Sequence, residues 1–129
     1  MGAASSVLVA DDDDALCESI ADVLRDEGYD VRTARHGGEA LELLRSEPPC
    51  LMLLDLMMPV VSGWEVLDAL RHDEAVRART RVVVISAAGK QALAQLPSWV
   101  EVMAKPLDYN ALIHAVERHC APAKLAVTS

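Results

Sequence analysis

Short apolar runs alternate with amphipathic stretches along nearly the whole chain. The apolar runs are residues 7–10, 29–34, 50–56, 81–87 and 100–104. The amphipathic stretches have apolar residues at helical spacing and lie at 15–27, 39–46, around Val66, Leu67 and Leu70, at 90–96 and at 108–120. Apolar runs this short indicate strands rather than buried helices. Five strand–helix repeats therefore predict an α/β fold with a parallel sheet and helices on both of its faces.

The best-defined boundaries are those of the first predicted helix. Asp13 and Asp14 precede its apolar face, where acidic side chains favour a helix N-terminus. Gly28 follows its last apolar residues and suits a C-terminal cap, because glycine adopts the left-handed backbone conformation at little cost.

The strand patterns also predict the order of the sheet. The first, third and fourth runs are continuously apolar, as expected for central strands that are covered on both faces. The second and fifth runs carry charges, such as Asp30 and Glu101, which places them at the edges. With right-handed crossovers, the order 2-1-3-4-5 satisfies these patterns and gives a doubly wound, flavodoxin-like sheet. Ligands of such sheets bind where the strand order reverses, here between the first and third strands.

Size and charge limit the organisation and the partners. The 129 residues with 52% apolar content suit one domain, which we place at 6–120 between a flexible leader (1–5) and a flexible tail (121–129). A net charge of −8 argues against non-specific binding to nucleic acid or to anionic membrane. No apolar run is long enough to span a bilayer.

The chain has three cysteines, Cys17, Cys50 and Cys120, without Cys-x-x-Cys spacing. An odd number of cysteines inside apolar patterns indicates neither a disulfide framework nor a zinc site. We therefore expect unpaired cysteines and a reducing, cytoplasmic location.

Polar residues gather at the carboxyl ends of the predicted strands. Asp11 and Asp12 follow the first strand, Asp55 ends the third, Ser86 ends the fourth and Lys105 follows the fifth. The ends of parallel strands lie at one edge of a sheet, so the three carboxylates should converge. A cluster of oxygen ligands of this kind suits Mg²⁺, which would also relieve the repulsion among the acids. A nucleophilic carboxylate, a metal, an ammonium and a hydroxyl together indicate phosphoryl transfer to Asp55.

These motifs, in this order along residues 6–120, resemble the receiver domain of two-component response regulators, and its single-domain, chemotaxis-type members in particular. The matching segments are Val9-Ala10-Asp11-Asp12, Asp55-Leu56-Met57-Met58-Pro59 with Gly63, Ile85-Ser86-Ala87, and Lys105-Pro106. The resemblance implies that Asp55 is the phospho-acceptor and that Asp12, Asp55 and the Met57 carbonyl bind Mg²⁺ directly, with Asp11 acting largely through water. It further implies that Ser86 is the switch hydroxyl, that Lys105 pairs with the phosphate, and that the Lys105–Pro106 peptide is cis.

The resemblance also implies a function and partners. The phosphoryl group would come from a phospho-histidine on a sensor kinase or phosphotransfer protein, and the output would be contacts with a protein effector, by a monomer or a phosphorylation-dependent dimer. The domain would catalyse only its own phosphorylation and dephosphorylation. Many relatives carry an aromatic switch residue three positions before the lysine, whereas this chain has Val102, so an aromatic-rotamer readout is excluded there.

Other functions are compatible with part of the pattern. A phosphorelay intermediate or a phosphate sink uses the same residues as a switch. An aspartyl-phosphate phosphohydrolase requires a second Asp two positions after the nucleophile, where this chain has Met57. A pseudo-receiver that is not phosphorylated usually lacks the acids or the lysine, and all of them are present here.

Overall fold

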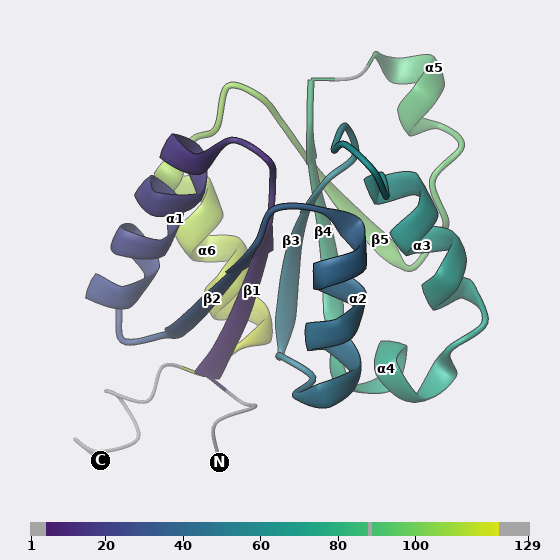
Figure 1. Cartoon of the computed structure of the whole chain (residues 1–129). Helices are drawn as coiled ribbons and strands as arrows, with labels where there is room; N and C mark the ends of the chain where they lie inside the picture. The colour runs from purple at the N-terminus through teal and green to yellow at the C-terminus, as the bar shows by residue number, and fades with distance from the viewer. Residues whose placement is uncertain (1–4, 88, 122–129) are drawn as a thin grey trace.

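A parallel five-stranded sheet lies between two layers of helices in the computed structural model, which describes residues 5–87 and 89–121 (Figure 1). The strands are β1 (Ser6–Ala10), β2 (Asp30–Ala34), β3 (Leu51–Asp55), β4 (Arg81–Ser86) and β5 (Val100–Ala104). The helices are α1 (Asp14–Asp26), α2 (Gly37–Ser46), α3 (Gly63–Arg71), α4 (Glu74–Arg79), α5 (Lys90–Leu93) and α6 (Tyr109–His119). None of the helices in the described ranges could cross a membrane. Apart from Ser5 and Ala121, the predicted leader and tail lie outside these ranges.

The strand order is β2-β1-β3-β4-β5 with every pair parallel, so the predicted order and fold class are confirmed. All residues of β1 and β3 are buried, because helices cover both faces of the central strands. The edge strands β2 and β5 are only partly buried, in agreement with the charges they carry.

Each face of the sheet has its own apolar core. Helices α1 and α6 cover one face (Figure 1). There Ile20 and Leu24 of α1 and Leu112 and Val116 of α6 belong to the buried apolar cluster. The opposite face is covered by α2, α3 and α4, which contribute the buried apolar residues Ala40, Leu44, Val66, Leu67, Leu70 and Val76. Burial of large side chains on both faces stabilises the sheet and fixes its register.

The caps of α1 follow the sequence prediction. The Asp13 carboxylate accepts a hydrogen bond from the Leu16 N–H at 3.1 Å and so caps the helix N-terminus. Gly28 has φ 98°, the left-handed conformation expected just after a helix, and its N–H donates to the Arg25 carbonyl at 3.0 Å.

Two helices differ from the prediction. Helix α4 was not predicted, because its six residues bury only Val76 and show too little periodicity. Helix α5 has four residues, about one turn, instead of the roughly two turns expected for 90–96. After it, the N–H groups of Gln95 and Leu96 donate to carbonyls three residues earlier, so the chain tightens before Pro97.

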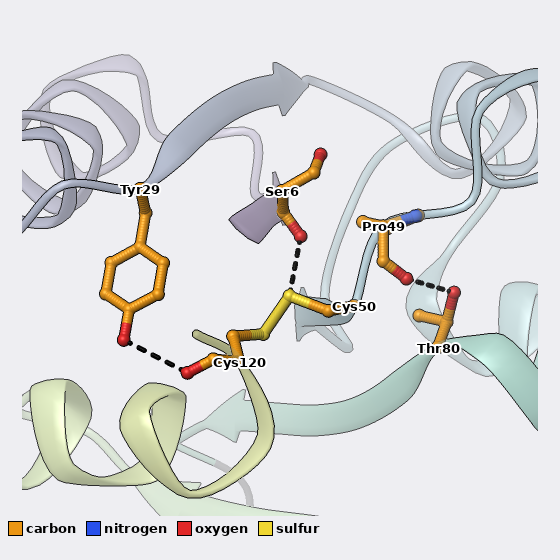
Figure 2. Close-up of a disulfide and its surroundings, with 6 residues drawn as sticks. All are labelled: Ser6, Tyr29, Pro49, Cys50, Thr80 and Cys120. Atoms are coloured by element: carbon orange, nitrogen blue, oxygen red, sulfur yellow. Dashed lines mark hydrogen bonds between the residues drawn. A yellow bond between two sulfur atoms is a disulfide. The ribbon is translucent and has the colours of Figure 1, made fainter. Parts of the chain in front are cut away.

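The expectation of unpaired cysteines is wrong for two of the three. Cys50, directly before β3, and Cys120, at the end of α6, form a disulfide with an S–S distance of 2.01 Å and a Cα–Cα distance of 5.8 Å (Figure 2). The Tyr29 hydroxyl donates to the Cys120 carbonyl at 3.3 Å. No local spacing indicates this pair, because its members are 70 residues apart and meet only after α6 has packed against the sheet. Cys17 is a free, buried thiol.

The start of α3 lies directly against the backbone of Asp55. The Gly63 N–H donates to the Leu56 carbonyl at 3.0 Å. A Cβ at position 63 would lie 2.3 Å from the Asp55 carbonyl oxygen and 2.6 Å from the Leu56 Cα. Only glycine fits this approach, because both obstructing groups are backbone atoms that cannot rotate away.

We therefore predict that Gly63→Ala lowers the free energy of unfolding by roughly 2–3 kcal/mol, because the added methyl group overpacks the turn after β3. Chemical denaturation monitored by circular dichroism measures this difference. Gly89→Ala is the matched control, since a Cβ there would meet no atom within 4 Å. Equal stabilities of the two variants would contradict the assigned close approach.

Candidate functional site

Three carboxylates meet at the carboxyl edge of the sheet, where the strand order reverses. Asp11 and Asp12 follow β1, and Asp55 is the last residue of the adjacent strand β3. One carboxylate oxygen from each of the three lies within 4.8 Å of the others. The structure thus brings together the acids that the sequence analysis selected.

The three acids differ in burial and in backbone support. Asp11 and Asp55 are 3% and 5% exposed, whereas Asp12 is exposed. The Asp13 N–H donates to Asp11 Oδ1 at 2.9 Å, and the Met57 N–H donates to Asp55 Oδ1 at 3.3 Å. These backbone donors fix the two buried carboxylates at the edge of the sheet.

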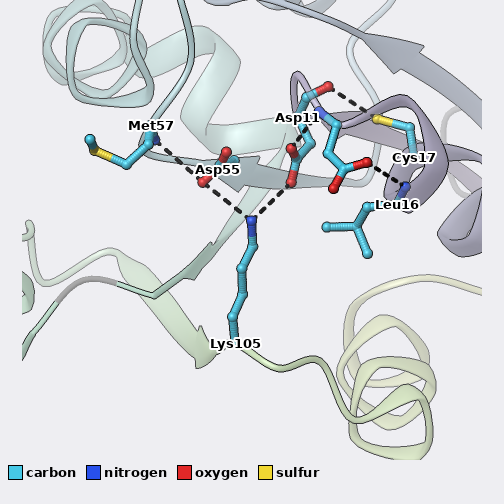
Figure 3. Close-up of polar contacts among 7 residues, drawn as sticks. Asp11, Leu16, Cys17, Asp55, Met57 and Lys105 are labelled. Carbon is cyan, nitrogen blue, oxygen red and sulfur yellow. Dashed lines mark hydrogen bonds and ion pairs between the residues drawn. The ribbon is translucent and has the colours of Figure 1, made fainter.

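Lys105 approaches both buried acids from the loop after β5. Its Nζ lies 3.4 Å from Asp11 Oδ2 and 3.7 Å from Asp55 Oδ1 (Figure 3). The Lys105–Pro106 peptide is cis, as the family resemblance implied. The Lys105 N–H donates to the Ser86 carbonyl at 3.0 Å, which joins the ends of β4 and β5.

Ser86 and Met57 complete the set of predicted site residues. Ser86 is the last residue of β4 and is 1% exposed, so its hydroxyl lies inside the protein at the same edge as the acids. Met57 follows β3 by two residues, and its side chain points to solvent with 70% exposure. Its backbone, rather than its side chain, therefore belongs to the site.

The electrostatics of the cluster favour a cation. Burial, together with the neighbouring Asp11 carboxylate, raises the pKa of Asp55 above its ordinary value, although the Met57 N–H and Lys105 act in the opposite direction. One ammonium thus does not balance the carboxylates of the cluster. Clustered carboxylate oxygens are the ligands that Mg²⁺ prefers, so the donor set fits a divalent metal.

Sequence reasoning missed one supporting residue of the site. The buried Cys17 thiol donates to the Asp11 carbonyl at 3.1 Å and ties α1 to the loop that carries the acids. Burial, and then the nearby Asp11 carboxylate, raise the pKa of this thiol to about 11, so it stays protonated and can donate. No motif could have indicated this contact, because Cys17 has the apolar helical spacing of an ordinary core residue.

The sequence profile of the response regulator receiver domain matches residues 7–117. The chain belongs to this family. It is a receiver domain of two-component response regulators, a class of phosphorylation-controlled signalling domains.

Relatives of this receiver domain are found among full-length regulators. It is 43% identical to response regulator RR06 of Streptococcus pneumoniae over 86 residues, which are 67% of this chain and 38% of that protein. It is 44% identical to the DNA-binding response regulator MtrA of Mycobacterium tuberculosis over 70 residues, 54% of this chain and 31% of MtrA. The matched parts thus amount to about a third of the length of these relatives.

Solved structures of similar size share the fold. The receiver domain from Bermanella marisrubri has a TM-score of 0.80 and 30% identity, with coverage of 90% of this chain and 98% of that one. Response regulator TrrA of Thermotoga maritima, solved in complex with Mg²⁺-BeF, has a TM-score of 0.77 and 29% identity, with coverage of 88% and 97%.

We predict that Asp55→Asn stabilises the metal-free receiver domain at neutral pH by roughly 1–2 kcal/mol, the usual scale for a poorly compensated buried polar group. The folded state raises the pKa of Asp55 above its ordinary 3.8, so it binds this proton more tightly than the unfolded state does. The contribution of Asp55 to stability consequently falls as the pH rises from 3.8 through the folded-state pKa.

Denaturant unfolding in the presence of a chelator, at several pH values from acid to neutral, measures both effects. The advantage of Asp55→Asn should be present at neutral pH and should disappear below the unfolded-state pKa, where both proteins are uncharged at this position. A stability difference that is constant across this range would show that repulsion and burial of the Asp55 charge are not its cause.

Proposed function

We propose that Asp55 accepts a phosphoryl group from a phospho-histidine of a sensor kinase or phosphotransfer protein, and that this reaction switches the domain between signalling states. The observation that carries the proposal is the convergence of Asp11, Asp12 and Asp55 on one point, with Lys105 within 4 Å of two of them. A cytoplasmic location is part of this proposal.

The chemistry follows from the positions of these groups. An oxygen of the Asp55 carboxylate attacks phosphorus, the P–O bond forms and the P–N bond to the histidine breaks, and the ring nitrogen of the histidine keeps the electron pair. Asp11, Asp12, Asp55 and the Met57 carbonyl would hold Mg²⁺, which supplies positive charge to the phosphoryl oxygens. Lys105 supplies the remaining positive charge, because phosphorylation of Asp55 adds phosphoryl oxygens next to its Nζ.

The switch would operate by a shift in populations. Ser86 is buried at the end of β4, at the same edge as Asp55, and in this proposal its hydroxyl hydrogen-bonds a phosphoryl oxygen in one of the two arrangements. Val102 on β5 is 39% exposed and has no polar or aromatic group, so the readout would use the surface around β5 without a rotating ring. The output would be contacts with a protein effector, because the net charge of −8 argues against nucleic acid and anionic membrane as partners.

We predict that incubation with a small phosphodonor such as acetyl phosphate and Mg²⁺ adds one acid-labile phosphoryl group to the wild type and none to Asp55→Asn. Intact-mass measurement with and without acid treatment detects the product. Asp68→Asn is the matched control, because Asp68 is an exposed aspartate on α3 outside the site. Phosphorylation of Asp55→Asn to the wild-type extent would contradict the assignment of the acceptor.

We also predict that Asp12→Ala weakens Mg²⁺ binding by at least about tenfold, because it removes one carboxylate from a three-carboxylate site. Asp12 is exposed, so the variant should fold normally. Titration calorimetry measures the affinity, and Asp22→Ala on α1 is a control that removes an exposed aspartate elsewhere. Similar affinities of both variants would place the metal at a different site.

A further inference from the structure

A basic pocket opens at the end of the sheet opposite to Asp55. It has a volume of about 320 Å³, and its wall includes Cys50 together with five basic residues of α4, β4 and α6. The basic residues are Arg77, Arg79, Arg81, Arg118 and His119. Such a concentration of arginine is unexpected in a chain with 12 basic and 20 acidic residues, so the pocket is a local reversal of the overall charge.

Two of these guanidinium groups have no hydrogen-bond or ion-pair partner among the described residues. Arg118 and His119 pair with Glu101, and Arg77 lies over the Trp99 ring at 5.3 Å. The side chains of Arg79 and Arg81 are exposed, and within residues 5–87 and 89–121 they form no hydrogen bond or ion pair. The pocket therefore offers two unneutralised cations, which suits a ligand that carries carboxylates.

The same wall includes one of the two disulfide residues. Cys50 is half-buried and lines the pocket, whereas Cys120 is only 6% exposed. The Cys50 N–H donates to the Ser6 carbonyl at 2.9 Å, and the Cys50 carbonyl accepts the Arg81 N–H at 3.0 Å, so neighbouring strands fix the position of this sulfur. Of the two disulfide residues, only Cys50 lines the pocket, so it is the one that an entering nucleophile meets.

The reduced state has a hydrogen-bond acceptor in place. Cys50 Sγ lies 3.0 Å from the Ser6 carbonyl oxygen (Figure 2). In the disulfide this sulfur has no proton, so the approach is only a contact. After reduction, the Cys50 thiol can donate to the same carbonyl without moving. The site can thus accommodate both oxidation states of Cys50.

From these observations we infer that the pocket is a thiol–disulfide exchange site for small anionic thiols, meaning thiols that carry carboxylates, such as glutathione. Arg79 and Arg81 bind the carboxylates, and the thiolate of the ligand attacks Cys50 Sγ. A new S–S bond forms between ligand and Cys50, and the Cys50–Cys120 bond breaks. Cys120 leaves as a thiolate and takes a proton from water. A second thiolate releases the ligand disulfide and leaves Cys50 reduced.

This site is independent of the proposed phosphorylation. Cys50 and Asp55 are separated by the length of β3, five residues or about 16 Å. The residues that line the pocket and the residues of the carboxylate cluster have no member in common. Exchange at Cys50 can therefore be tested on protein that has never been phosphorylated, and its outcome does not depend on the role of Asp55.

The test compares the rates at which glutathione and neutral 2-mercaptoethanol reduce the disulfide at equal thiolate concentrations. Alkylation of the free thiols followed by intact-mass measurement gives the reduced fraction at each time. The net charge of −8 alone would make the anionic thiol the slower reagent. We expect the pocket to reverse this order, so that glutathione reacts about tenfold faster than the neutral thiol. Added salt at 0.5 M should reduce the difference severalfold, because it screens exposed charges.

The matched variants are the double substitution Arg79→Gln/Arg81→Gln in the pocket and Arg25→Gln/Arg45→Gln outside it. Both remove two positive charges, but only the first should lower the glutathione rate, by about tenfold, while the 2-mercaptoethanol rate stays constant. In Cys120→Ser, oxidised glutathione should form a mixed disulfide at Cys50, identified by peptide mapping. Equal effects of the two double variants, a wild-type preference for the neutral thiol, or the absence of a Cys50–Cys120 bond in the oxidised protein would overturn the inference.

Discussion

The contact of Lys105 with two buried carboxylates is the interaction around which the acidic end of this protein is arranged. Asp11 and Asp55 lie at the ends of adjacent strands, where their charges repel each other and are poorly hydrated. The ammonium group of Lys105, in the loop after β5, lies 3.4 Å from Asp11 Oδ2 and 3.7 Å from Asp55 Oδ1. The loops after β1, β3 and β5 are therefore linked by charge as well as by the sheet.

Much of the surrounding structure serves to hold these three charges in place. Backbone N–H groups of Asp13 and Met57 support the carboxylates, and the bond from the Lys105 N–H to Ser86 aligns the loop that carries the ammonium. Even so, burial and then the Asp11 carboxylate keep the pKa of Asp55 above its ordinary value, and three carboxylates face one ammonium group. A site that is fixed in position and short of positive charge is well suited to bind a metal and then a phosphoryl group.

The sequence was sufficient to predict features that depend on chemical type and order along the chain. Continuous apolar runs identified the central strands, and polar residues at strand ends predicted that Asp11, Asp12, Asp55 and Lys105 lie together at one edge of the sheet. Features that depend on packing could not be predicted. The Cys50–Cys120 disulfide requires α6 to lie beside the start of β3, and the contact of Cys17 with the Asp11 carbonyl requires the turn into α1.

The short helix α4 could not be predicted from the sequence either. Helix α4 buries one apolar residue, so it has no periodic pattern to detect, and its position depends on its neighbours, including the Asp73 cap and the carbonyls of Leu70 and Arg71 that accept from Arg77. Local propensity alone does not determine such a segment, because short helices depend on tertiary contacts for most of their stability.

The close approach of Gly63 to the Asp55 backbone makes the surroundings of Asp55 differ from one side to the other. On the α3 side, the backbone of Gly63 packs directly against the backbone of Asp55, with no side chain between them. A displacement of the Asp55 backbone toward α3 would therefore have to move the start of the helix as well. On the other side, β4 leads to the one-turn helix α5 and to the partly exposed edge strand β5. The surroundings of Asp55 are therefore backbone packed on backbone toward α3 and less buried toward β5.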